Sequence, residues 1–306
     1  MIEIDHERLR TLGLTPAMAQ QAAAAATDDD AIPRTLMRVV QIHRETIRVH
    51  DGRSEHAARV LPRLVRELED AGTALAVGDW VLVASDPHRE RWVRALLAPS
   101  AHLCRRDADG RRHPVVSNVD TALLVMGLDD DFNPRRLERY LALVRAGDVD
   151  PVVVLTKVDI AHRTEGLVAA RIESLHGRLP ASVDLHLVDG TDPETAERLR
   201  PHLAPGRTLV LLGSSGAGKS TLTNTLLGAP TQDTGAVREH DSRGKHTTTS
   251  RSLHRLPGGA CVIDTPGLRA LRPDVDEATL AATFADIDRL AMQCRFRDCR
   301  HADEPG

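Results

Sequence analysis

The sequence is poor in aromatic residues, in cysteine and in lysine, and it has no long apolar run. Aromatic residues make up 2% of the 306 residues, which argues against extensive stacking on nucleic-acid bases. The four cysteines are too few and too unevenly spaced for a disulfide framework, so reduced thiols are expected. No apolar run approaches the roughly 18–20 residues that span a bilayer, and the acidic start MIEIDHERLR has no signal-peptide core. We therefore expect a soluble cytoplasmic protein with no membrane partner.

Positive charge is not in excess either, and it is carried almost entirely by arginine. The net charge of -4 excludes a protein that coats nucleic acid with a surface that is basic overall, so any RNA contact must be local. Arginines cluster in residues 105–113 and 294–301, where they either neutralise RNA phosphates or form an ordinary solvated surface. Lysine occurs only as Lys157, Lys219 and Lys245. A compact ammonium is not interchangeable with a guanidinium, so these three positions are candidates for sites whose geometry requires a lysine.

The residue pattern divides the chain into four parts. Residues 1–33 form an Ala-rich helical extension, and residues 34–112 contain short alternating stretches and a hairpin signal, which favour an OB-like β-barrel. Within that barrel, VLPRLVRELEDAG is more helical than five strands require. Residues 113–271 alternate apolar strands with helices, as in a covered parallel sheet, and residues 272–306 are a helical segment ending in a Cys/His cluster. The fold class is therefore multi-domain.

Four apolar strands are expected in the α/β part, and each ends at a motif. They are VDTALLVMGL, PVVVLTKVD, RTLVLLG and ACVIDTPG, and RRLERYLALVRAG forms an amphipathic helix behind the first. Ligands of open α/β sheets bind at the carboxyl ends of the strands. The motifs should therefore meet at one edge of the sheet.

The strongest motif is GSSGAGKST, which follows an apolar strand and precedes a helix as GxxxxGK[ST] requires. Its backbone amides and the helix N-terminus can hold phosphates, Lys219 can reach the β and γ oxygens, and Ser220 offers a hydroxyl to Mg²⁺. The predicted phosphate-binding residues are Gly213, Ser214, Ser215, Gly216, Ala217, Gly218, Lys219, Ser220 and Thr221.

Two further motifs complete a nucleotide site. In DTPG, Asp264 can hold Mg²⁺ through water and the Gly267 amide can sense a γ-phosphate. In TKVD, formed by Thr156, Lys157, Val158 and Asp159, the carboxylate can accept two hydrogen bonds from guanine, which adenine cannot donate. The usual motif begins with Asn rather than Thr, so a capping role for this segment, and with it an ATPase or kinase, stays open.

The order of these motifs is informative. The guanine motif precedes the phosphate loop, whereas the ordinary GTPase order is phosphate loop, switch and guanine motif. Because chain termini usually lie close together, a permuted sheet can bring the same loops to one site. The domain is therefore predicted to be a circularly permuted P-loop GTPase domain.

Taken together, residues 33–306 resemble the ribosome small-subunit-dependent GTPase A family. The resemblance rests on NVDTALLVMGLDDDFNPRRLERYLALV, TKVD, GSSGAGKST, GAVREHDSRGKHTTT and DTPG, preceded by GDWV and followed by CRFRDCRHADEPG. It implies an OB domain, a permuted GTPase domain and a zinc-binding C-terminal segment. It also implies action late in small (30S) subunit maturation, with hydrolysis of GTP to GDP stimulated by the subunit, and contact with rRNA. We expect the chain to act as a monomer.

The resemblance also assigns switch I to residues 235–249, with Thr248 completing the Mg²⁺ shell beside Ser220 and Asp264. Without it, this stretch could equally be a polar loop. Leu268 stands where Ras-like enzymes place a water-orienting Gln, so another residue must organise the attacking water. His246 is the candidate, although an ordinary surface histidine is the alternative.

Cys294, Cys299 and His301 match the first three ligands of C-x4-C-x-H-x5-C, and thiolates with an imidazole suit one tetrahedral zinc ion. The fourth ligand would fall just after Gly306. Either the chain is cut short there, or the position is taken by water or by nothing.

Two function classes remain open at this stage. One is a GTPase timer on the small subunit, and the other is an RNA-docking factor in which the nucleotide only switches affinity. A permuted GTPase of another ribosomal particle is a further alternative, which the barrel before the sheet and the Cys/His tail argue against.

Overall fold

The computed structural model describes residues 2–25, 32–43, 46–106, 112–229 and 251–264. Its N-terminal half contains β1 (Ile2–Glu3), α1 (His6–Arg10), α2 (Pro16–Ala24), β2 (Arg34–Ile42), β3 (Ile47–His50), β4 (Glu55–Val60), α3 (Pro62–Asp70), β5 (Trp80–Ser85), β6 (Arg91–Leu96), β7 (His102–Arg106) and β8 (Arg112–Ser117). The remainder contains β9 (Thr121–Gly127), α4 (Pro134–Ala146), β10 (Asp150–Thr156), α5 (Val158–Ala161), α6 (Leu167–Leu175), β11 (Asp184–Leu187), α7 (Glu194–Arg198), η1 (Arg200–His202), β12 (Thr208–Leu212), α8 (Lys219–Leu227), β13 (Ser252–Arg255) and β14 (Cys261–Asp264). None of the helices in these ranges is long and apolar enough to cross a membrane.

Five strands close into a small barrel, as the sequence predicted. Strands β2, β3, β4, β6 and β5 pair in that order, and β5 returns to pair with β2. The stretch VLPRLVRELEDAG, which was more helical than a barrel requires, forms α3 between the third and fourth strands. The barrel interior is apolar and is filled by Met37, Val39, Ile47, Val49, Ala58, Leu64, Val81, Val83 and Val93.

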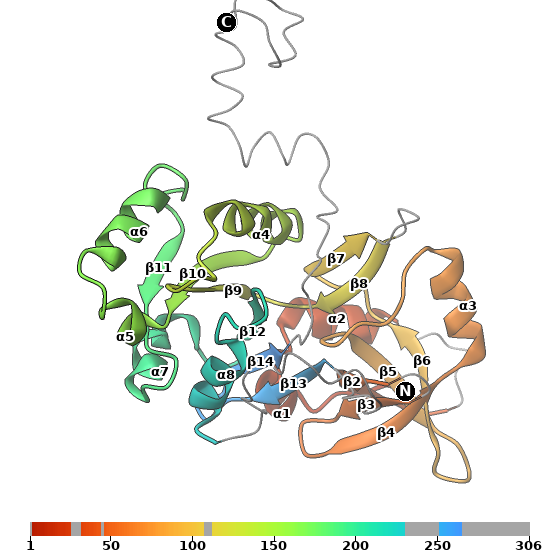
Figure 1. Ribbon diagram of the computed structural model, residues 1–306. Coiled ribbons are helices and arrows are strands. Elements are labelled where there is room, and N and C mark those ends of the chain that lie inside the picture. The colour runs from red at the N-terminus through yellow and green to blue at the C-terminus, as the bar shows by residue number, and fades with distance from the viewer. Residues whose placement is uncertain (1, 26–31, 44–45, 107–111, 230–250, 265–306) are drawn as a thin grey trace, which may run out of the picture.

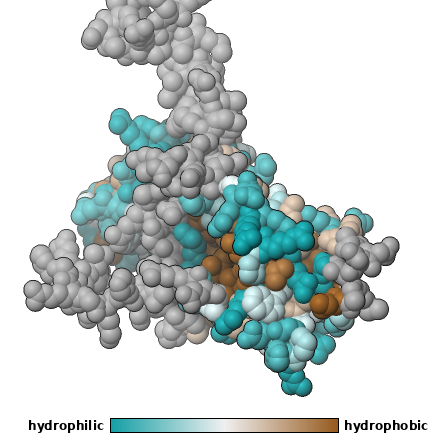
Figure 2. Space-filling model, turned by 90° about the vertical axis from the view of Figure 1, so that its right-hand side faces the viewer, coloured by the Kyte–Doolittle hydropathy of each residue, from teal (hydrophilic) through white to brown (hydrophobic). Residues whose placement is uncertain are grey.

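On the barrel side of the molecule, apolar atoms reach the surface among polar ones (Figure 2). A pocket of about 420 Å³ lies between α3 and the barrel strands, with Val65, Leu68, Ile47 and Trp92 in its lining. Val65 is 38% exposed there.

The second part is a parallel sheet with helices on both faces (Figure 1). The strand order is β11-β10-β9-β12-β14-β13, and all pairs are parallel except β13 with β14. Strands β9 and β12 are buried along their whole length, because alternate side chains serve two different cores. One core contains Leu124, Met126, Leu137, Leu141 and Val144, and the other contains Leu123, Val125, Leu209, Leu222 and Leu226.

The helix predicted at RRLERYLALVRAG is α4, and it begins at an Asn133 side chain that accepts a hydrogen bond from the Arg136 amide. Its predicted apolar face, Leu137, Tyr140, Leu141 and Val144, is buried. Strands β11 and β13 and the hairpin of β7 with β8 were not anticipated. The proposed boundary between residues 112 and 113 falls inside the first residues of β8, and the division into domains stays a prediction.

The N-terminal extension is part of the core rather than an appendage. Helices α1 and α2, red in Figure 1, lie between the barrel and the parallel sheet. Leu9 of α1, Leu12 between the helices and Ala22 of α2 are at most 1% exposed and share a core with residues of β9 and β12. The first residues, expected to be helical, form β1 instead, which pairs in parallel with β2.

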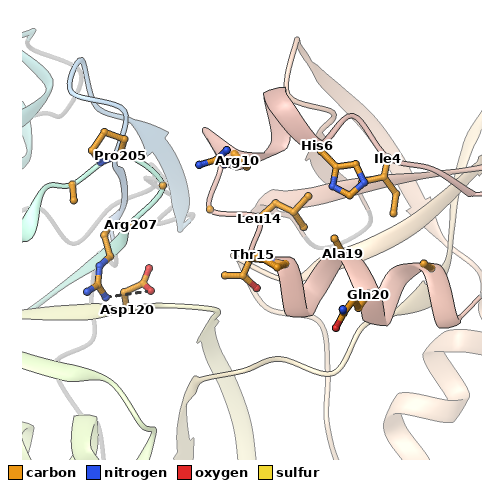
Figure 3. A pocket seen from close by; sticks show the side chains of 15 residues that line it. Ile4, His6, Arg10, Leu14, Thr15, Ala19, Gln20, Asp120, Pro205 and Arg207 are labelled. Atoms are coloured by element: carbon orange, nitrogen blue, oxygen red, sulfur yellow. Dashed lines mark hydrogen bonds and ion pairs between the residues drawn. The ribbon is translucent and has the colours of Figure 1, made fainter.

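A pocket of about 860 Å³ lies where this extension faces the loop before β12 (Figure 3). His6, Leu14 and Ala19 line one side, and Pro205 and Arg207 line the other. Arg207 approaches Asp120 to 3.5 Å.

One buried side chain joins the three parts. Arg38 in β2 is 0% exposed, and its guanidinium donates hydrogen bonds to the Gly78 carbonyl at 3.1 Å, the Asn118 carbonyl at 2.8 Å and the Thr208 hydroxyl at 2.9 Å. It also donates to the Leu12 carbonyl and lies 5.4 Å from the centre of the Trp80 ring. Burial lowers the pKa of Arg38, with the nearby Cys261, Asp120 and Asp79 opposing this. Each of the three guanidinium nitrogens therefore has an acceptor, and the acceptors come from four separate segments.

Replacing Arg38 by Met should destabilise the protein by about 3–5 kcal/mol, because buried carbonyls would lose their donor. Urea unfolding of the two proteins measures this difference. Arg48→Met is the matched control, since Arg48 is 44% exposed in its 2.7 Å pair with Glu55 and should contribute at most about 1 kcal/mol. Equal effects of the two substitutions would contradict the role assigned to Arg38.

Asp79, next to Trp80, is a buried carboxyl that should make stability depend on pH. Burial raises its pKa to about 6, although the Ala76 amide, the Ser117 hydroxyl and the charge of Arg38 favour ionisation. The folded chain thus holds this proton up to about pH 6, while the unfolded chain releases it near its ordinary pKa of 3.8. The stabilisation is therefore complete below about pH 4 and is lost as the pH rises through about 6.

Asp79→Asn removes this titration. The unfolding free energy of the variant minus that of the parent should increase by about 2–3 kcal/mol between about pH 4 and pH 7. Urea titrations at several pH values measure it, with the exposed carboxylate of Asp70→Asn as control. A difference that does not change with pH would exclude the raised pKa.

Candidate nucleotide-binding site

The predicted motifs meet at one edge of the parallel sheet. TKVD follows β10, the phosphate loop follows β12, and Asp264 ends β14. These strands are parallel and are joined in the order β10-β9-β12-β14, so their carboxyl ends lie together. The sequence order of the motifs is thus circularly permuted without separating them in space.

The phosphate loop is shaped by glycines at two points. A Cβ on Gly213 would lie 2.3 Å from the Val125 carbonyl oxygen, so only glycine lets the loop leave β12 so close to β9. Gly218 has a φ of +89° and begins α8, and no side chain caps the helix. The loop therefore presents an uncapped helix N-terminus, which suits a phosphate group.

Lys219 lies over this loop. Its Nζ donates hydrogen bonds to the carbonyls of Gly213 at 2.9 Å and Ser214 at 2.6 Å. The ammonium is thus held at the mouth of the loop, where it can reach phosphate oxygens.

Thr156 connects the predicted guanine motif to the phosphate loop. It is 1% exposed, and its hydroxyl lies 2.7 Å from the Ala217 carbonyl and 3.5 Å from that of Met126. The hydroxyl donates to the loop carbonyl, a bond that an amide side chain at this position could also make. The replacement of Asn by Thr therefore keeps a physical connection between the two motifs.

Lys157 follows in a left-handed conformation, with a φ of +61°. Its Nζ lies 2.6 Å from Asp129 Oδ2 in the loop after β9. Burial alone would raise the pKa of Asp129, but the bonds from Lys157 and the Asp131 amide lower it. This ion pair joins the TKVD segment to the loop after β9, and Asp159 of the same segment is exposed.

Asp131 is a site residue that the motifs did not single out. Its carboxylate accepts hydrogen bonds from the Gly127 amide at 3.1 Å, from Arg136 Nη2 at 2.7 Å and from the Ser214 hydroxyl. It thus ties the phosphate loop to the end of β9. In the sequence, the acidic run DDD directly after an apolar strand was the feature that could have indicated Asp131 as a site residue.

The loop after β11 is a second part of the site that no sequence motif indicated. The Val188 carbonyl accepts a hydrogen bond from the Val158 amide at 3.4 Å, and the Gly190 carbonyl accepts one from the Thr225 hydroxyl at 2.6 Å. This loop thus contacts both TKVD and α8. Its strand has only four residues, which weakens the sequence signal.

The remaining predicted residues divide into two groups. Ser220 lies in the first turn of α8, and Asp264 is 3% exposed at the end of the strand adjacent to β12. Outside the described residues lie Thr248, His246, Gly267, Cys294, Cys299 and His301.

A phosphate loop on a central strand, with the base-reading segment on strands that precede it in the chain, defines a circularly permuted P-loop GTPase. Comparison with known proteins agrees. The sequence model of the RsgA GTPase family matches residues 97–273. A curated "Small ribosomal subunit biogenesis GTPase RsgA" from Xanthomonas axonopodis pv. citri is 44% identical over 99% of this chain and 82% of the relative. The chain belongs to the RsgA GTPase family and is a GTP hydrolase.

Other comparisons extend this result. A relative of the same name from Xanthomonas campestris pv. campestris is 46% identical over 93% of this chain and 76% of its own. Among solved structures, YjeQ from Thermotoga maritima has a TM-score of 0.63 at 23% identity, covering 89% of this chain and 88% of the other. YloQ, described as a circularly permuted GTPase, has a TM-score of 0.57 at 24% identity, covering 92% and 88%. These two likenesses support the fold.

Thr156→Val should lower the affinity for GDP and GTP about 10-fold, because the buried Ala217 carbonyl would lose its donor and release the phosphate loop. Titration with a fluorescent guanine nucleotide measures the change. Thr164→Val, in the exposed turn after α5, is the control. Unchanged affinity would show that the hydroxyl does not hold the loop.

Proposed function

We propose that this protein is a GTPase of small ribosomal subunit biogenesis. It binds the small (30S) subunit late in maturation and hydrolyses GTP to GDP and phosphate when the subunit stimulates it. The observation that carries this proposal is the 44% identity to a small-subunit biogenesis GTPase along nearly the whole chain. The joined phosphate and base-reading loops supply the nucleotide chemistry.

The residues of the site have separable tasks. The amides of residues 213–221 and the ammonium of Lys219 hold the β and γ phosphates, and Asp159 accepts hydrogen bonds from guanine. Ser220, Asp264 and Thr248 would hold Mg²⁺, which neutralises charge on the phosphate oxygens when bound. The hydroxyl of Ser220 in the first turn of α8 and the carboxylate of Asp264 at the end of β14, the strand paired with β12, are oxygen ligands that suit this ion.

The attacking water needs an organiser, since Leu268 follows DTPG. We assign that role to His246 and the γ-phosphate sensing to the Gly267 amide. A change at DTPG then passes into the C-terminal segment, where Cys294, Cys299 and His301 hold one zinc ion by thiolate and imidazole ligation.

Contact with rRNA is assigned to the arginine clusters at residues 105–113 and 294–301, because phosphate neutralisation needs local cations. The chain acts as a cytoplasmic monomer. Recognition is of folded RNA shape rather than of stacked bases, in keeping with the 2% aromatic content.

Purified small subunits should raise GTP turnover many-fold, and Lys219→Ala should lower stimulated turnover about 100-fold or more, because the lysine stabilises transition-state charge. Phosphate release with and without subunits measures both. Large subunits are the control for another ribosomal particle. Salt-sensitive binding without stimulation would instead support an RNA-docking factor.

In the same assay, His246→Ala should lose stimulated turnover while keeping nucleotide affinity. His176→Ala, an exposed histidine after α6, is the matched control. Unchanged stimulated turnover in His246→Ala would remove that residue from the mechanism.

A further inference from the structure

Two histidines and an aspartate converge at the edge strand β11. Asp184 and His186 lie on β11, and His202 ends η1. Asp184, Thr121 and Asp150 are the first residues of β11, β9 and β10. All three residues line one pocket of about 560 Å³. Asp184 is in register with Val152 of β10 and His186 with Val154, so they lie about 13 Å and about 7 Å along the strand from Thr156 of TKVD. The side-chain contacts of the two histidines are with each other and with Asp184, and not with the nucleotide motifs.

The side chains point toward one another. His186 Nε2 lies 3.0 Å from His202 Nε2, and His202 Nε2 lies 3.6 Å from Asp184 Oδ2. One ligand atom from each of the three residues lies within 4.8 Å of the other two. The two rings are nearly perpendicular, at 84°, and both present Nε2 at the contact.

These distances match what a bound metal ion requires. Zinc lies about 2.0–2.2 Å from imidazole nitrogen and carboxylate oxygen, so tetrahedral ligand atoms are about 3.3 Å apart. The 3.0 Å and 3.6 Å separations bracket that value. The carboxylate is 69% exposed and can rotate to close the third distance, whereas His202 is 14% exposed and held in place.

The fold gives this arrangement a physical reason. Asp184 and His186 are two residues apart on a strand, so they project from the same face. The fully buried Leu199 anchors the turn that brings His202 beside them. Strand β11 pairs with β10 along one side and ends the order of the described sheet on the other (Figure 1). An ion here would join that edge strand to η1.

The charge of the pocket allows a cation. Its lining contains the aspartates Asp148, Asp150 and Asp184 against the arginines Arg145 and Arg207. A hydrogen bond between the two imidazoles would explain the 3.0 Å contact alone, whereas a bound ion accounts for that contact and for the carboxylate 3.6 Å from His202 together.

We propose that Asp184, His186 and His202 bind one zinc ion, whose remaining position is open to water, and that this ion fastens β11 to η1. Two imidazoles and one carboxylate suit zinc among the first-row divalent metals. The site is distinct from the cysteine-containing cluster at residues 294–301.

The test uses the chain with Cys294→Ser and Cys299→Ser, which removes the thiolates of the C-terminal cluster, and is done without nucleotide. Competition with a chromophoric chelator should show one Zn²⁺ per chain. His202→Gln should weaken binding about 100-fold and Asp184→Asn about 10-fold. His176→Ala, which lies outside the cluster, should leave the affinity unchanged.

Cobalt provides a second measurement. Co²⁺ in this chain should give tetrahedral ligand-field bands without thiolate charge-transfer absorption, and His202→Gln should remove them. With Zn²⁺ at about the parent's Kd, hydrogen exchange at β11 should slow in the parent and much less in Asp184→Asn, whose exposed substitution preserves folding. Zn²⁺ affinity equal in the parent and His202→Gln would overturn the proposal.

Discussion

The buried guanidinium of Arg38 constrains the whole arrangement of this molecule. An arginine without exposed surface is tolerated only where its donors are satisfied, and the acceptors here come from Leu12, Gly78, Asn118 and Thr208. These residues belong to the N-terminal extension, the barrel, the segment before β9 and the central strand of the sheet. No one of these parts can move away without leaving the charge in an apolar interior. The barrel and the parallel sheet are therefore joined by a polar contact as well as by the shared apolar core.

At the nucleotide site, too, side-chain hydrogen bonds join segments that are far apart in the chain. The hydroxyl of Thr156 and the carboxylate of Asp131 connect loops that are about 60 to 80 residues apart in the chain to the phosphate loop. Both bonds lie at the carboxyl edge of strands that remain adjacent whatever their order along the chain. Circular permutation is tolerated because the site depends on which strands are neighbours, and not on which comes first.

Strand β11 contributes to both sites. Its carboxyl end leads into the loop that contacts TKVD and α8 through Val188 and Gly190, and Asp184 and His186 are its first and third residues. It has only four residues and, among the described strands, pairs only with β10, so few backbone hydrogen bonds hold it in the sheet. The metal ion inferred above would act on this edge strand.

The sequence by itself determined the parts that depend on local pattern. The phosphate loop, TKVD, the order of the motifs, the apolar strands β9, β10, β12 and β14 and the buried face of α4 could all be read from spacing and periodicity, because backbone geometry and side-chain alternation are local. The family could be read for the same reason. Tertiary structure alone decided the rest. The burial of Arg38, the hydrogen bonds of Thr156 and Asp131 and the meeting of His186 with His202 join residues far apart in the chain, and a single residue in a sequence carries no record of the partners that folding will bring to it.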